Sequence, residues 1–136
     1  MKKYEFFEHT ADVKFKSYGG SLNEVFENCA LAVSKIISRD GKIKSKKKKK
    51  IEIESDNNES LLYNFIDELL YLLDAEEFVV SKAVVKISKT KLKADIFGDD
   101  SQSYENLDHI KAATYSEMYI KEIKKGKWEA QAVVDV

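Results

Sequence analysis

A histidine, a threonine and an aspartate lie close together near the start of the chain, in the stretch Glu8-His9-Thr10-Ala11-Asp12-Val13. An aromatic, strand-like run precedes this stretch, and apolar and charged residues alternate after it over residues 13–16. The pattern predicts a loop between two strands, and loops on a rigid scaffold are frequent positions for functional residues. The commoner alternative is a polar turn whose Asp and Thr side chains bond the neighbouring backbone. The residues alone leave both interpretations open.

Carboxylates at the two ends of the sequence suggest a second kind of chemistry. Asp12 closes the first loop, while Asp135 and the carboxylate of Val136 end the sequence. If the first and last strands finish near each other, these groups repel one another unless a cation neutralises them. Ligands that are all oxygen select hard ions, Ca²⁺ or else Mg²⁺ or Mn²⁺, over zinc. The alternative is that Asp135 is an ordinary exposed residue at the end of a strand.

Other familiar catalytic sets are missing from the sequence. Gly19-Gly20 precede a predicted helix but lack the Gly-Lys-Ser/Thr that completes a phosphate-binding loop. His9 and His109 are too few and too far apart for a zinc-binding helix motif. Cys29 lies on the apolar face of a predicted helix, which indicates a core residue and argues against a Cys-His nucleophile.

The hydrophobic pattern predicts the elements that position these residues. Apolar residues at helical spacing predict helices over residues 21–38 and 59–74, the first with a capping box at Ser21 and Glu24. Strands are expected at residues 3–8, 12–17, 78–88, 91–97, 117–123 and 127–136, with a polar loop at 98–102. This order predicts one domain over residues 1–136, an α+β two-layer sandwich with two main helices on one face of a mostly antiparallel sheet. The side chains expected in the core include Phe26, Val33, Phe65, Leu69 and Trp128.

The composition narrows the class of protein. The chain has 136 residues, of which 43% are hydrophobic and 35% charged, and its formal net charge is −1. These values indicate a folded globular domain without the overall positive field of a typical nucleic-acid-binding protein. The single cysteine cannot form an intrachain disulfide, which favours the reducing cytoplasm. No apolar run is long enough to span a membrane.

A run of lysines, Lys46–Lys50, precedes the alternating residues 51–54, and together they predict a strand. Lysines on an edge strand block unwanted pairing with other chains. The alternative is a contact with RNA phosphates or with an acidic partner. The sequence slightly favours the protective interpretation, because no aromatic residues stand between the lysines to stack on bases.

Several short motifs resemble those of the archease family. The first is Glu8–Val13 with Gly20 and the helix opened by Ser21 and Glu24; the others are Leu61-Leu62, Glu68-Leu69-Leu70, Lys111-Ala112-Ala113-Thr114-Tyr115, and Trp128-Glu129 with Val133–Val136. Together they follow the family's order along nearly the whole chain. The sequence departs from the pattern at Ser116, where the family often has His, and at Asp99, where Glu is common.

The resemblance implies a compact α+β fold and a set of functional residues. In archeases a metal site is made by the Asp of the His-Thr-Ala-Asp stretch, the Asp next to the C-terminus and the terminal residue. Here these are Asp12, Asp135 and Val136. The family pattern also implies that Lys111 is a functional lysine beside that site, and we expect Lys111 and His9 to contact a phosphate or a partner carboxylate.

Archeases are accessory proteins of the RtcB-type RNA ligase, which joins tRNA halves after intron removal. The resemblance therefore implies a non-catalytic activator that promotes guanylylation and multiple turnover of that ligase and meets tRNA through it. Two other functions remain open: a nucleic-acid-binding module that uses Lys46–Lys50, and a small metal-dependent phosphohydrolase that uses the same carboxylates.

Overall fold

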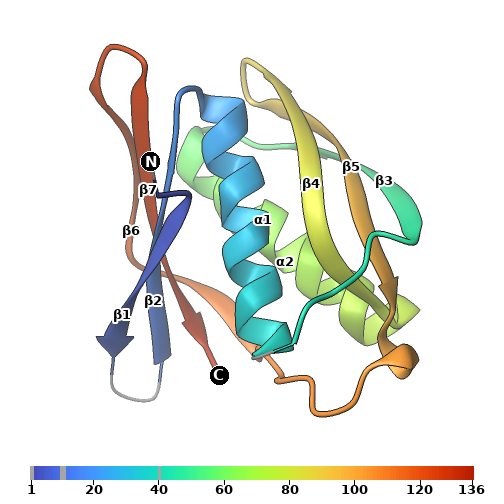
Figure 1. Cartoon of the computed structure of the whole chain (residues 1–136). Coiled ribbons are helices and arrows are strands. Elements are labelled where there is room, and N and C mark those ends of the chain that lie inside the picture. Colours follow the sequence, from blue (N-terminus) through green and yellow to red (C-terminus); the bar gives the residue numbers. More distant parts are fainter. Residues whose placement is uncertain (1, 10–11, 40) are drawn as a thin grey trace.

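The computed structural model describes residues 2–9, 12–39 and 41–136, with only the backbone of Glu8 and His9 (Figure 1). The elements follow one another as β1 (Tyr4–His9), β2 (Asp12–Gly19), α1 (Leu22–Ser38), β3 (Lys47–Glu54), α2 (Asn58–Glu76), β4 (Phe78–Ser88), β5 (Lys91–Asp100), a short 3-10 turn (Ser101–Ser103), β6 (Ala112–Lys124) and β7 (Lys127–Asp135). Among the described residues, no helix is long and apolar enough to cross a membrane.

The strands form two antiparallel sheets, one with the order β1-β2-β7-β6 and one with the order β3-β5-β4. Helix α1 runs between the sheets and packs against β2 of the first and β4 of the second, while α2 contacts β6 and β4 (Figure 1). The expected α+β class, with two main helices and antiparallel strands, is confirmed. The single sheet of the sequence analysis is corrected to two, because alternation shows which face of a strand is buried but not which strand lies beside it.

Local signals account well for the helix starts. The Ser21 hydroxyl accepts a hydrogen bond from the Glu24 N–H at 3.1 Å, and the Glu24 carboxylate accepts one from the Gly20 N–H at 2.6 Å. This is the reciprocal capping box that the sequence predicts. Helix α2 begins after Asn57, whose side chain accepts from the Ser60 N–H at 2.8 Å. Both helices therefore start within two residues of the expected positions.

The core lies on the inner faces of the sheets and around the two helices. Phe26, Val33, Phe65 and Leu69 are at most 1% exposed, as expected, and the rings of Phe26 and Phe65 lie 5.6 Å apart. Trp128 is a correction, since it is only half-buried. Its direct partner across the β2–β7 pair is a glycine, Gly19, which offers no side chain to cover the indole.

The expected polar loop at residues 98–102 is also wrong, because β5 continues through Gly98 to Asp100. A Cβ atom at Gly98 would lie 2.1 Å from the Val79 carbonyl oxygen, so the close approach of β4 requires glycine inside this strand. Asp99 is 4% exposed and accepts hydrogen bonds from the Tyr104 hydroxyl at 2.7 Å and from the Asp100 N–H at 2.8 Å. These bonds hold the pKa of the Asp99 carboxyl below its ordinary value.

Candidate functional site

Two of the carboxylates singled out in the sequence meet at one end of the four-stranded sheet. Asp12 and Asp135 are direct partners across the antiparallel β2–β7 pair, and both are half-buried. Directly opposed residues of such a pair share one face of the sheet, with Cβ atoms about 4.5–5.5 Å apart. The two side chains therefore stand next to each other, although 122 residues of sequence lie between them.

Residues of the neighbouring strands β1 and β6 lie beside Asp12 and Asp135 and form a row with them across the sheet. His9 is the partner of Asp12 across β1–β2, and Ala112 is the partner of Asp135 across β6–β7. The side chain of His9 lies outside the described part of the chain. The Lys111 N–H donates a 2.8 Å hydrogen bond to the Asp135 carbonyl oxygen, so Lys111 lies beside Asp135, one residue before β6 begins. Val136 follows Asp135 and is exposed.

The chemistry of the donors fits a hard divalent cation. Asp12 and Asp135 present oxygen atoms on one face of the sheet, and Ca²⁺ takes six to eight oxygen ligands of this kind. In the part of the chain that the structure describes, no group of three His, Cys, Asp or Glu side chains is arranged to hold a metal. Two carboxylates make an incomplete cage, so an ion here would need further oxygens from the main chain, water or a partner.

The outer face of the same sheet carries charges that are already paired. The Lys14 ammonium lies 3.4 Å from Glu117, and the Lys16 ammonium lies 3.9 Å from Glu129. The Tyr18 hydroxyl donates to Glu5 at 2.9 Å, and burial followed by this bond raises the pKa of Tyr18 to about 12. Tyr18 therefore stays neutral and keeps donating near neutral pH. The sequence did not predict this network, which favours a structural role.

The lysine run lies at the edge of the three-stranded sheet, since β3 is the outermost strand of the order β3-β5-β4. Lys48 and Lys50 are exposed. Lys49 instead lies 2.8 Å from the Glu76 carboxylate and 5.9 Å from the centre of the Phe78 ring. An edge position supports the protective interpretation, because charged side chains on an edge strand discourage pairing with another chain.

Cys29 is buried, as expected of a core residue. Burial raises the pKa of its thiol, because a thiolate would lose its hydration inside the core. A protonated, inaccessible thiol is a poor nucleophile. The residues that remain as a candidate site are therefore the carboxylate pair and Lys111.

These features define a small α+β protein whose second and last strands bring two carboxylates together, with no group of three metal-ligating side chains among the described residues. The same fold occurs in the solution structure of Methanobacterium thermoautotrophicum protein 1598, with a TM-score of 0.84, 35% identity and 100% of both chains covered. The model of the "Archease protein family (MTH1598/TM1083)" matches residues 4–136.

Curated relatives agree with that match. "Protein archease" of Pyrococcus abyssi is 42% identical, with 100% of both chains covered. "Protein archease" of Methanosarcina acetivorans is 39% identical, with 99% of this chain and 97% of the relative covered. The chain belongs to the archease family. Membership implies an accessory role in RNA processing and suggests a non-catalytic protein.

Proposed function

We propose that this protein activates an RtcB-type RNA ligase in tRNA splicing, as a non-catalytic accessory that promotes guanylylation and multiple turnover. Family membership over residues 4–136 supports the accessory role. The observation that carries the proposal is the direct pairing of Asp12 with Asp135. An end of a sheet that gathers two carboxylates and an exposed lysine suits the handling of metal and phosphate better than the burial of an apolar partner.

In this proposal Asp12, Asp135 and the carboxylate of Val136 hold a divalent ion, Ca²⁺ or else Mg²⁺ or Mn²⁺. The bound ion would supply positive charge that neutralises these carboxylates and attracts phosphate oxygens. Lys111, held just before β6 by its N–H bond to the Asp135 carbonyl, adds an exposed point charge beside them. His9, the partner of Asp12 in the row, is a further candidate contact. Phosphoryl transfer depends mainly on positioning and charge neutralisation, which such a surface would contribute at the ligase's nucleotide site.

The test is a guanylylation assay with an RtcB-type ligase and labelled GTP. Adding this protein is expected to accelerate formation of the ligase–GMP adduct and to raise the number of RNA molecules joined per ligase. The Asp135→Asn variant, which keeps the side-chain shape and removes the charge, is the matched control and is expected to activate poorly. An unchanged rate with the native protein would contradict the proposal. Turnover of a phosphoester by the isolated protein would favour the phosphohydrolase instead.

The lysine run gives a separate prediction. Replacing both Lys48 and Lys50 by Gln should change the free energy of unfolding by no more than about 0.5 kcal/mol, because both side chains are exposed. Activation of the ligase should survive, since an edge-protecting role needs no specific contact. Denaturant unfolding and the guanylylation assay measure the two quantities. Loss of activation in a variant with unchanged stability would make the run a docking surface.

A further inference from the structure

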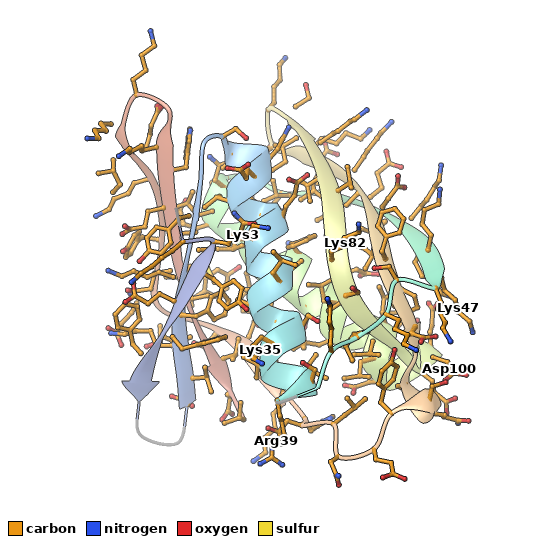
Figure 2. All side chains as sticks on the ribbon, viewed as in Figure 1. Lys3, Lys35, Arg39, Lys47, Lys82 and Asp100 are labelled. Carbon is orange, nitrogen blue, oxygen red and sulfur yellow. The ribbon has the colours of Figure 1, made fainter. Side chains whose placement is uncertain are left out.

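A groove of about 850 Å³ lies over α1, between the start of β1, the segment 41–45 and β4. Figure 2 labels Lys3, Lys35 and Lys82 around this face of α1. Lys42 and Lys44 line the groove as well, so five lysines from separate parts of the chain converge on it. The run of lysines on β3 contributes none of them.

The groove concentrates positive charge in a chain whose formal net charge is −1. Its described lining residues include no Asp or Glu. None of its five lysines forms an ion pair with a described carboxylate. Lys3 and Lys82 also line a neighbouring depression that holds Glu24 and Glu27. These two carboxylates, both in the described part of the chain, accept backbone N–H groups, from Gly20 and Val85, and form no ion pair with either lysine. The Lys82 ammonium lies 5.4 Å from the centre of the Phe97 ring, and this contact does not neutralise its charge. The lysine charges are therefore available to a ligand.

Hydrogen bonds fix the segment that carries Lys42 and Lys44. The Ser81 hydroxyl on β4 donates to the Ile43 carbonyl at 3.0 Å and lies 2.9 Å from the Ser45 hydroxyl. The Lys44 N–H donates to the Tyr104 hydroxyl at 2.9 Å, and Ile43 is only 4% exposed. The backbone of this wall is thus already ordered, so a ligand does not have to order it on binding.

We propose that this groove binds the sugar-phosphate backbone of single-stranded RNA. Lysines act as point charges for phosphate, and serine hydroxyls that line the same groove can donate to phosphate or ribose oxygens. These hydroxyls belong to Ser34 and Ser38, because the hydroxyl protons of Ser45 and Ser81 are already used in the bonds that fix the groove wall. Tyr4 is the only aromatic residue among the described lining residues, so recognition rests on phosphates and is independent of sequence.

The choice of RNA as the polyanion rests on the proposed function, while the charge and shape of the groove do not. The position of the groove is consistent with RNA as its ligand, because a segment of the chain connects the groove to the proposed site at Asp135. Ser38 and Gly41 line its end at the last turn of α1, where the Ile37 carbonyl accepts a 2.8 Å hydrogen bond from the Asp108 N–H. The segment after Asp108 leads to Lys111 and its bond with Asp135. In Figure 1 this end of α1 and the C-terminus lie at the same end of the molecule.

The test measures binding of a fluorescent uridine oligonucleotide of about 12 nucleotides to the isolated protein by anisotropy. Each lysine–phosphate contact on a single strand contributes about 0.7 to the slope of log affinity against log salt. Five contacts predict about a 100-fold loss of affinity between about 50 and about 200 mM salt. The triple variant Lys35→Gln, Lys42→Gln, Lys44→Gln keeps two contacts and should lose only about 7-fold over the same range.

The matched control removes three exposed lysines from the β6–β7 hairpin, by Lys124→Gln, Lys125→Gln and Lys127→Gln, and should retain the native affinity and salt slope. Equal losses in both triple variants, or no binding by the native protein at about 50 mM salt, would overturn the proposal. Equal displacement of the RNA by polyglutamate would overturn the choice of ligand. The assay contains no ligase, so a failure here is separate from a failure of ligase activation.

Discussion

Alanine at Asp12 or at Asp135 is expected to abolish the stabilisation that Ca²⁺ or Mg²⁺ gives to this protein. An ion that binds only the folded state stabilises it by mass action, by about 2.7 kcal/mol at a hundredfold excess over its dissociation constant. Because the two aspartates are direct partners on one face of the β2–β7 pair, loss of either leaves one side-chain ligand. Melting curves recorded with each ion and with a chelator measure the effect.

The carboxylate of Val136 makes the melting measurement specific for the proposed metal site. A tag joined after Val136 converts its carboxylate into a neutral amide, so it should weaken the metal-dependent shift, which a diffuse effect of surface charge would not do. Lys111→Ala should reduce ligase activation with a smaller effect on metal-dependent melting, because it is not a ligand. Glu105→Ala, an exposed acidic change elsewhere, should leave both unchanged. The same shift in the native protein, both Asp variants and the tagged protein would refute the three-ligand site.

Phe65→Ala is expected to lower the free energy of unfolding by about 3–5 kcal/mol. The ring is fully buried on α2 and lies 5.6 Å from the ring of Phe26 on α1, so its removal leaves a cavity between the two helices. The free energy of unfolding of small domains is only about 5–15 kcal/mol, so this loss is a large fraction of the total. Denaturant titration at constant pH measures the change.

Tyr71 on the same helix provides the control, because its side chain is 55% exposed. Tyr71→Ala should change the free energy of unfolding by no more than about 0.5 kcal/mol. A comparable loss in the two variants would mean that helix propensity, not packing, controls the stability of α2. A loss below about 1 kcal/mol for Phe65→Ala would contradict the packing of the two helices against each other.

The sequence by itself determined the elements that depend on neighbouring residues. The capping box at Ser21 and Glu24 placed the start of α1, and apolar residues at helical spacing placed both helices and most of their buried side chains. Alternation located most of the strand residues, although β6 begins at Ala112 and not at the expected residue 117. The lysines of residues 46–50 indicated an edge, where β3 indeed lies. These signals are local, since caps and periodicity act within a few residues of the chain.

The tertiary structure decided what depends on residues far apart in sequence. It divided the strands into two sheets and placed Gly98 inside β5, where the Val79 carbonyl leaves no room for a side chain. It left Trp128 half-buried because its partner is Gly19. Neither the pairing of β3 with β5 nor that of β2 with β7 can be read from alternation, because a strand presents the same two faces to any neighbour.

The two candidate sites show the same division. The sequence singled out Asp12 and Asp135 by their chemistry, but only the β2–β7 register makes them direct partners. The basic groove left no pattern in the sequence, because its lysines come from the start of β1, from α1, from the segment after it and from β4. Charges scattered over 80 positions become one surface only when helix and sheet pack together, so the fold alone creates that site.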